Sequence, residues 1–285
     1  ALPLPKIQIG TRGFVPIGFT KGLFAVHATY AHGWFGRQDS VQGSYLHQKT
    51  VYVRLGKPQW KAKFYLGIIH NVQWGGETEF GESQFKVKGK YPSSFKDYLY
   101  LVIAKQPRGN YANIDTLNQI GNHLGSIDFG IELPGNKWNI FIYHQHPFED
   151  KSGLVFVNFP DGLYGIRFRN KKNEVLTSFR FNHITFEHLT TMNKGANLRA
   201  DLQIRYMADQ YFNHAQYVDG WSYKQRIIGT SFITRYLDTR SEIIDPRFLS
   251  KNIRRRMINN NSVNLYHTAI NGSFKNGIKV DARFS

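Results

Sequence analysis

The sequence predicts an all-β protein, and three observations favour an antiparallel transmembrane β-barrel of the outer-membrane type. Apolar and polar residues alternate in many segments, as they do along a strand with one apolar face. The longest nearly continuous apolar run, residues 98–104, is much shorter than the about 20 residues that a membrane helix needs. The polar side of the alternation carries arginine, lysine, aspartate and glutamate together, as the wall of a hydrated lumen would.

The alternation gives the expected strands in chain order. Residues 198–206, for example, place Arg199, Asp201 and Arg205 on one face and leucine, isoleucine and tyrosine on the other. The turn residues 134–137, Pro-Gly-Asn-Lys, separate two alternating segments, which is typical of a β-hairpin. We expect strands at residues 24–30, 46–55, 61–68, 84–88, 127–133, 138–143, 164–169, 175–181, 198–206, 227–235, 263–270 and 278–284.

These strands are expected to form one domain, residues 1–285. A membrane strand of ~9–11 residues with its connection takes ~20–25 residues, so the chain holds about 12–14 strands. Short turns alternate with longer polar connections such as residues 33–43 and 208–220, as in a barrel with larger loops on one side. A soluble β-sandwich would show the same alternation. The large number of strands and the aromatic residues near their ends favour the barrel.

Charge and cysteine content restrict the partners. Lysine and arginine exceed aspartate and glutamate by 37 − 20 = 17, a surplus that suits a polyanion such as nucleic acid, lipopolysaccharide or an acidic polysaccharide. The basic residues are spread over the strands, and the run 254–256 is interpreted as a solvated turn, so we do not expect a nucleic-acid partner. Cysteine is absent, which excludes disulfides and thiolate sites. The first residues, Ala-Leu-Pro-Leu-Pro-Lys, do not have the pattern of a signal peptide, so we expect a mature, trimmed or excerpted chain.

Several motifs, taken in order, resemble one family. They are His-Gly-Trp-Phe-Gly at 32–36, Leu-His-Gln-Lys at 46–49, His-Asn-Val-Gln-Trp-Gly-Gly at 70–76, Asp-Gln-Tyr-Phe-Asn at 209–213, Gly-Trp-Ser-Tyr at 220–223 and Ile-Gly-Thr at 228–230. The ordered set resembles the capsule assembly Wzi family of outer-membrane β-barrels. The resemblance spans nearly the whole chain.

The resemblance implies a location in the bacterial outer membrane and a non-catalytic role in holding or organising surface polysaccharide. Family members typically close an 18-stranded barrel, so the about 12–14 strands expected here would be its central part, without strands at both ends. The implied partners are outer-membrane lipid and lipopolysaccharide, an acidic surface polysaccharide, and other outer-membrane proteins. Two further functions stay open, an anion-selective porin-like channel and a structural subunit of a larger outer-membrane assembly.

Candidate polysaccharide-binding residues combine flat aromatic rings with cationic groups. Aromatic rings stack on sugar rings, and arginine recognises carboxylates in bidentate geometry. The alternative is that the tryptophans belong to the aromatic girdles of a barrel. The candidates are Trp34, Arg37, Trp74, Trp221, Tyr223 and Arg226.

A second set of candidates lies on the polar strand faces. These arginines could line the lumen as a surface selective for anions. The interpretation that we favour pairs them with Asp128, Glu132 and Asp201, because partly desolvated charges need partners. The lumen candidates are Arg54, Arg167, Arg169 and Arg180.

The sequence offers little support for metal or catalytic chemistry. His144 and His146 lie on one strand face but supply only two ligands, so we expect no metal site and no cofactor. Glu187 and His188, with Ser178 or Asp209, are not arranged by any motif as nucleophile, base and orienting group. We therefore expect a protein that is not an enzyme.

Overall fold

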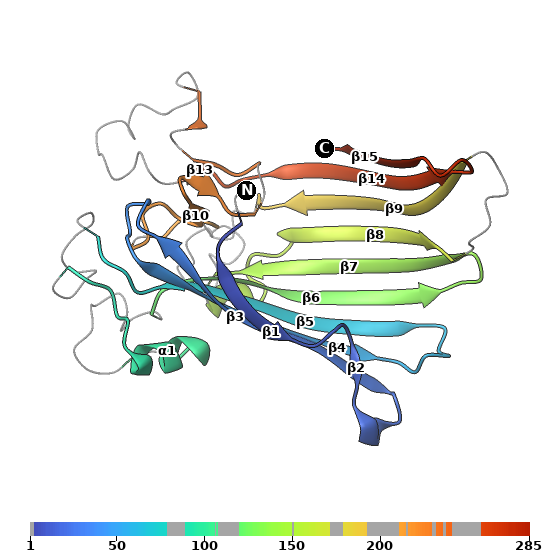
Figure 1. The fold of residues 1–285 in the computed structure, drawn as a ribbon, viewed down its shortest axis with the longest axis horizontal. Helices are drawn as coiled ribbons and strands as arrows, with labels where there is room; N and C mark the ends of the chain where they lie inside the picture. Colours follow the sequence, from blue (N-terminus) through green and yellow to red (C-terminus); the bar gives the residue numbers. More distant parts are fainter. Residues whose placement is uncertain are drawn as a thin grey trace, which may run out of the picture.

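A computed structural model describes residues 3–78, 89–105, 107, 120–149, 151–171, 179–192, 211–214, 216–229, 232–235, 238–240 and 258–285, and the structural statements below concern these residues. Most of them lie in long strands, which confirms the all-β class (Figure 1). The main strands are β1 (Lys6–Gly10), β2 (Val15–Pro16), β3 (Phe24–Gly36), β4 (Ser44–Leu55), β5 (Lys63–Trp74), β6 (Asn122–Pro134), β7 (Trp138–Phe148), β8 (Gly162–Asn170), β9 (Phe179–Thr190), β14 (Asn264–Phe274) and β15 (Lys279–Phe284).

These strands form one 11-stranded antiparallel sheet in the order β1-β3-β4-β5-β6-β7-β8-β9-β14-β15, with β2 also paired to β3. From β3 to β9 each strand pairs with the next one in the chain, so this part is a simple up-and-down meander. The edge strands β1 and β15 each pair with one neighbour and not with each other, so the described strands do not close a barrel.

The remaining elements are short and lie in the connections. Four strands form two small sheets, β10 (Ser222–Tyr223) with β11 (Arg226–Ile227) and β12 (Thr234–Arg235) with β13 (Ile258–Asn260). The helices are η1 (Gly18–Thr20), α1 (Phe95–Val102) and α3 (Lys151–Leu154). Among the described residues, no helix is long and apolar enough to cross a membrane.

The predicted strands differ from the observed ones in instructive places. Of the predicted strand 227–235, the described residues include the end of β11 at Ile227 and β12 at Thr234–Arg235. Gly229 adopts φ 106°, which is not extended, and residues 230 and 231 lie outside the described residues. Of the predicted strand 175–181, residues 175–178 lie outside the described residues, and residues 179–181 belong to β9 (Phe179–Thr190). A bulge opposite Asn271 and Gly272 shifts its alternation by one residue. The predicted strands 84–88 and 198–206, with Asp201, lie outside the described residues.

The two ends of the sheet are unlike. At the short-turn end, residues 56–62, 135–137 and 275–278 join neighbouring strands; at the loop end, much longer segments follow β5 and β9 (Figure 1). This asymmetry agrees with the predicted alternation of turns and loops.

The two faces of the sheet differ in polarity, as the sequence alternation predicts. The first, here called the apolar face, exposes large side chains, among them Leu66, which is 53% exposed, Phe129 and Ile142. The second, here called the polar face, carries Tyr52 and Asp128 together with the other polar residues described below. The cross-strand register keeps each set on one side from β3 to β9, because paired residues share a face.

Candidate functional site

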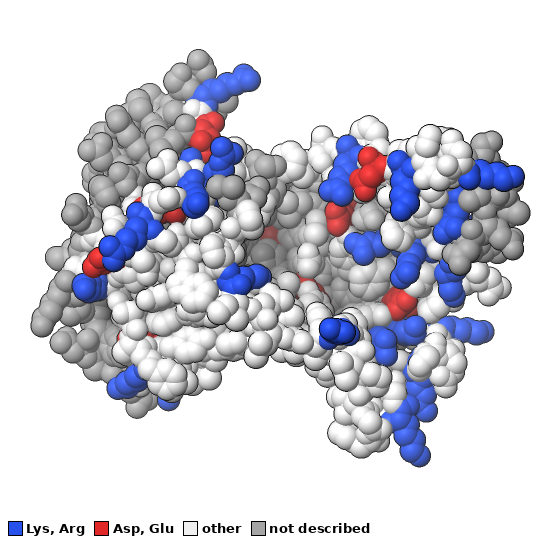
Figure 2. All heavy atoms as spheres, viewed as in Figure 1, with Lys and Arg blue, Asp and Glu red and all other residues white. Residues whose placement is uncertain are grey.

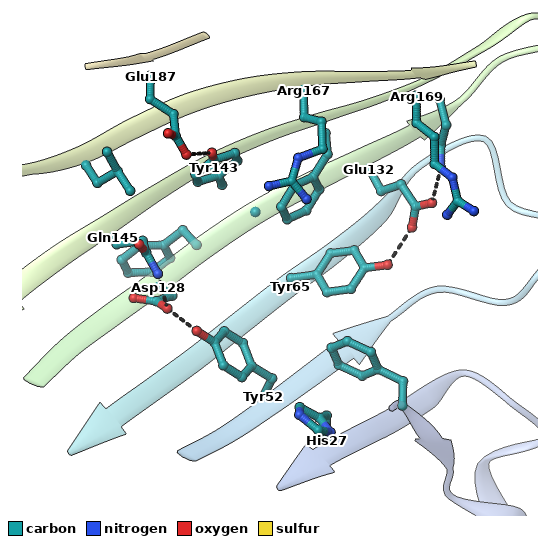
Figure 3. Close-up of a pocket in the computed structure, with 16 residues that line it drawn as sticks. His27, Tyr52, Tyr65, Asp128, Glu132, Tyr143, Gln145, Arg167, Arg169 and Glu187 are labelled. Carbon is teal, nitrogen blue, oxygen red and sulfur yellow. Dashed lines mark hydrogen bonds between the residues drawn. The ribbon is translucent and has the colours of Figure 1, made fainter. Parts of the chain in front are cut away.

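The polar face contains a cavity of about 530 Å³, here called the polar-face cavity. Figure 3 shows its lining side chains rising from the middle of the sheet, and the space-filling view shows a recess there with basic and acidic side chains beside it (Figure 2). A second cavity of about 380 Å³ shares Arg167, Arg169 and Glu187 with it and extends to β14 and β15. The residues that line the polar-face cavity include Phe14, His27, Tyr52, Tyr65, Asp128, Gly130, Glu132, Asn139, Phe141, Tyr143, Gln145, Leu163, Arg167, Arg169 and Glu187.

Each carboxylate of the cavity accepts a hydrogen bond from a tyrosine. The Tyr52 hydroxyl donates to Asp128 and the Tyr143 hydroxyl donates to Glu187. Glu132 accepts from the Tyr65 hydroxyl, from Asn139 Nδ2 at 2.5 Å, and lies 3.8 Å from Lys63 Nζ. These bonds fix the rings and the carboxylates in place, because hydrogen bonds to a charged acceptor are the stronger ones.

Two of these tyrosines reach their partner across a glycine on the strand between. Tyr52 is in register with Gly67, which is in register with Asp128. Tyr143, Gly165 and Glu187 repeat this arrangement. A Cβ atom on Gly67 would lie 2.1 Å from Cε1 of Tyr52, so the ring occupies the place of a side chain there. The result is a cavity floor of aromatic rings, in which Tyr143 is stacked on Phe141 and Tyr65 meets Phe141 edge-on. Tyr52, Tyr65 and Tyr143 are seen there in Figure 3.

The predicted lumen arginines lie on this sheet, and two of them line the cavity. Arg167 and Arg169 point into it from β8 (Figure 3), and the Arg167 guanidinium carbon lies 6.0 Å from the centre of the Tyr143 ring. Arg54 lies over the Phe14 ring at 5.7 Å. Arg180 is half-buried on β9, opposite Ser273.

The predicted pairing of these arginines with carboxylates differs from what the structure contains. Among the described residues, the ion pairs within 4.0 Å do not include Arg54, Arg167 or Arg169. Asp128 and Glu132 are instead bonded to tyrosine and amide groups. The guanidinium groups of Arg167 and Arg169 therefore line the cavity without an ion pair to any carboxylate in the described part of the chain.

At the loop end, an apolar cluster covers the polar face. This loop-end cluster consists of Phe35, Leu46, Trp221 and Tyr223, which are all buried. Phe35 and Leu46 come from β3 and β4, on the polar face, while Trp221 and Tyr223 come from the long segment between β9 and β14. The β10–β11 hairpin is thus packed over the strands as a cover for one end of the polar face.

The same hairpin carries exposed cations at its turn. Lys224 and Gln225 have φ of 49° and 60°, the combination of a type I′ turn. The Asp39 carboxylate accepts hydrogen bonds from both backbone N–H groups, at 3.1 and 2.8 Å, and so holds this strained turn. Burial raises the pKa of the Asp39 carboxyl, the two backbone bonds oppose the rise, and the neighbouring Asp219 carboxylate adds to it.

Beside this turn lies a second basic hollow of about 580 Å³, here called the loop-end pocket. Lys224 and Arg226 line it, are exposed, and are absent from the ion pairs found among the described residues. Arg235 also lines it and is held by Asp238, with Nε 2.9 Å from Oδ2 and Nη2 3.2 Å from Oδ1. The pocket can therefore attract an anion while one of its cations is fixed in position.

The structure does not bring the predicted sugar-binding aromatic residues together. Trp34 is 40% exposed on the apolar face of β3, next to His32. Trp74 is on the same face but buried beneath α1, and Trp221 is buried in the loop-end cluster with Tyr223. Both buried tryptophans are packing residues: Trp74 is covered by α1, and Trp221 packs onto the strands from the segment between β9 and β14. The sequence alternation does not predict where either of these segments lies.

The basic members of the predicted set are placed differently. Arg37 is exposed and lies two residues before Asp39, in the loop that caps the β10–β11 turn, and Arg226 is exposed in the loop-end pocket. Ser40 in the same loop donates from its backbone N–H and its hydroxyl to Asp219, at 2.5 and 2.9 Å. The loop carrying Arg37 is therefore fixed against the segment carrying Arg226.

Metal ligation gains no support from the described residues, since no group of three or more histidine, cysteine, aspartate or glutamate side chains is arranged around a common point. His144 and His146 lie on the apolar face of β7, where His146 is bonded to the Gly153 carbonyl at 3.1 Å and His144 stacks on Tyr164. The two rings thus have packing roles.

Comparison of the chain with family models, with curated proteins and with solved structures found no match. The interpretation of the site therefore depends on its geometry. The polar-face cavity offers aromatic rings, carboxylates and guanidinium groups, which suit hydroxyl-rich or anionic ligands. The tyrosine–carboxylate pairs were not predicted, because alternation assigns residues to a face but does not give the register that pairs them.

Proposed function

We propose that the chain is part of an outer-membrane β-barrel that binds acidic surface polysaccharide and does not catalyse a reaction. The observation that carries the proposal is the polarity of the sheet. Leu66, Phe129 and Ile142 are among many large apolar side chains exposed on one face, while charged groups lie on the other. A soluble sheet buries its apolar face, whereas a membrane barrel turns it to lipid and keeps the polar face inside.

The polysaccharide part of the proposal is supported by the loop-end pocket. Lys224, Arg226 and Arg235 line a hollow beside the loop that carries Arg37. In outer-membrane barrels the longer loops face outward, where a surface polysaccharide would be met. Guanidinium groups recognise the carboxylates of acidic sugars in bidentate geometry. The resemblance of the sequence motifs to the capsule assembly Wzi family points to the same ligand class.

Binding should depend on the loop-end cations and on the acidic groups of the glycan. We expect the double variant Lys224→Gln with Arg226→Gln to lose up to about tenfold in affinity for an acidic polysaccharide such as polygalacturonate, because two exposed charge-assisted contacts of about 0.2–1 kcal/mol each are removed. Affinity is measured by biolayer interferometry with the protein in detergent micelles.

Two controls make this test specific. Lys61→Gln with Lys137→Gln removes the same charge from exposed positions at the short-turn end and should leave affinity unchanged. Polygalacturonate whose carboxyl groups have been reduced should bind neither to the unaltered protein nor to the two double variants. Equal losses in both double variants would reduce the effect to overall charge, and an unchanged affinity in the loop-end variant would remove the pocket from the binding surface.

A second candidate function, an anion-selective channel, is favoured by one observation. Arg167 and Arg169 line the polar-face cavity without an ion pair in the described part of the chain, as the wall of an anion pathway would. The loop-end cluster lies across one end of that face, so passage would require its displacement.

A further inference from the structure

The apolar face changes its character toward the loop end. Near the short-turn end, β4 and β5 carry Val51 and Leu66 on this face, but closer to the loops the same face carries His47, Lys49 and His70. Polar groups in these positions would face lipid in a membrane barrel, where each would be costly. His47 and His70 are nevertheless only 0% and 5% exposed, so something covers them.

The helix α1 covers His47 and Lys49, while His70 packs against His123 of β6, with 2.8 Å between His70 Nε2 and His123 Nδ1. The side chain of Leu101 is fully buried against Val72 and Trp74 on the apolar face of β5. The Tyr98 hydroxyl contacts His47 Nδ1 at 3.3 Å, and Lys49 Nζ donates to the Val102 carbonyl. The helix therefore supplies hydrogen-bonding partners to His47 Nδ1 and Lys49 Nζ.

The opposite side of α1 is apolar and exposed. Phe95, Leu99 and Ile103 are spaced four residues apart, which places them along one side of the helix. Their exposed fractions are 76%, 51% and 66%. The helix thus hides a polar part of the strand surface and presents a new apolar surface in its place.

A second loop segment repeats this arrangement on β7. His144 and His146 lie on the apolar face of this strand, and His146 is fully buried. The segment that follows β7 covers them: the Gly153 carbonyl is 3.1 Å from His146 Nε2, and the Phe156 ring centre is 4.3 Å from that of His146. Asn158 fixes the segment by donating to the Pro147 carbonyl at 2.8 Å.

The outer side of this second segment is also apolar. Leu154, Val155 and Phe159 are all exposed, Val155 most of all. Two segments far apart in the sequence therefore do the same thing on the same face of the sheet. Each covers strand histidines at the loop end and turns large apolar side chains away from the sheet.

We infer that α1 with Ile103, together with residues 154–159, forms a lipid collar that lies in the interfacial layer of the surrounding bilayer. The inference rests on the membrane location in the proposed function. It is supported by contacts that join both segments to the exposed apolar face: the Phe156 ring centre lies 6.1 Å from that of Phe129, and the Tyr98 and Tyr30 hydroxyls are 2.5 Å apart. Lys96 and Lys105 are exposed beside α1 and are suited to lipid phosphate groups, as on helices that lie in a membrane interface.

The absence of cysteine from the chain allows a direct test. Single cysteines at Leu99→Cys and Val155→Cys are labelled with an environment-sensitive fluorophore, and the protein is reconstituted into vesicles of phosphatidylcholine and phosphatidylglycerol. Leu66→Cys reports on the strand surface and Asn136→Cys on an exposed turn. Quenching is measured with aqueous iodide and with spin labels at the head-group end or the tail end of the lipid chain.

If the collar lies in the bilayer interface, the probes at 99 and 155 should emit at shorter wavelength than the probe at 136 and should be quenched less by iodide than that probe. Among the spin-labelled lipids, the one labelled at the head-group end should quench them best. The probe at 66 should respond best to the deeper label. Probes at 99 and 155 that behave like the probe at 136, with the probe at 66 still in lipid, would overturn the collar and leave the membrane barrel intact. Iodide quenching at 66 would overturn both.

One further outcome separates lipid from protein as the occupant. If the apolar side of α1 were covered by a second copy of the chain, the probe at 99 would be shielded from both iodide and spin-labelled lipid, and its emission would change on dilution into excess lipid. That result would overturn the collar. The probe at 155, on a separate segment, gives an independent reading of the same question.

Discussion

At the scale of single residues, the floor of the polar-face cavity depends on glycines. The Tyr143 ring lies over Gly165 and stacks on Phe141 with ring centres 5.3 Å apart. Its hydroxyl donates a hydrogen bond to Glu187 on the strand beyond Gly165. A Cβ atom on Gly165 would lie 2.1 Å from Cζ of Tyr143. The ring is held from two sides, so it cannot give way without losing a contact.

We therefore expect Gly165→Ala to destabilise the folded protein by about 1–3 kcal/mol, the usual cost of overpacking. The free energy of unfolding is measured by denaturant titration in detergent micelles. Gly18→Ala is the matched control, because that glycine is exposed and a Cβ atom there would meet nothing within 4 Å. In a Tyr143→Ala background the Gly165 substitution should cost much less, and equal costs in both backgrounds would contradict the account.

The sequence predicts some of the residues that lie on the polar face, but it does not predict which residues pair across the strands. The polar strand faces predict Arg167 and Arg169 as inward-facing residues, and the structure places both in the cavity, beside Tyr143 and Glu187, which the sequence did not assign to it. The choice of tyrosine over arginine as the partner of each carboxylate depends on which residues are opposite each other, and that register is a property of the assembled sheet.

At the scale of elements, α1 depends on a local signal at its start. The Ser94 hydroxyl accepts from the Asp97 backbone N–H at 3.2 Å, and the Asp97 carboxylate accepts from the Ser94 N–H at 2.8 Å. This reciprocal pair is a capping box, which satisfies N–H groups that a helix start leaves unpaired. An eight-residue helix has little stability of its own, so the cap matters.

Ser94→Ala should cost about 1 kcal/mol of helix stability and raise amide hydrogen exchange in α1 about fivefold. Exchange is followed by mass spectrometry on peptides from residues 95–102. The neighbouring Ser93→Ala, which removes an exposed hydroxyl outside the cap, should leave exchange unchanged. Unchanged exchange in the Ser94 variant would mean that packing of Leu101 alone holds the helix.

The elements differ in how far the sequence predicted them. The hairpin of β6 and β7 was expected, because a Pro-Gly turn separates two alternating segments. The helix α1 was not, although Ser94 and Asp97 have the spacing of a capping box, because an apolar run of this length is too short to distinguish a helix from a buried strand. The strands are longer than predicted toward the loop end, since there the alternation gives way to histidine and lysine.

At the scale of the whole molecule, the sheet and its long connections have different roles, one forming the cavity and the other covering its end. The strands supply a polar face with a charged cavity, and the segment between β9 and β14 lays Trp221 and Tyr223 over its loop end. Sequence alternation predicted the strands, but it could not place Trp221, because a buried tryptophan in a loop is fixed only by contacts such as Phe35, whose ring centre is 6.5 Å away.

The loop-end cluster should act as a closure for ions. We expect the protein in planar bilayers to conduct little, and Trp221→Ala with Tyr223→Ala to conduct at least several-fold more, because two large side chains leave an apolar constriction that excludes water and ions. Trp34→Ala, which removes an exposed tryptophan from the apolar face, is the control and should not change conductance. High conductance of the unaltered protein would contradict the closure and favour the channel function, whereas low conductance of every variant would place the barrier elsewhere in the molecule.

Ion selectivity should depend on the two cavity arginines. In the variant that lacks Trp221 and Tyr223, the further changes Arg167→Gln and Arg169→Gln should reduce the preference for anions, measured as a shift in reversal potential under a salt gradient.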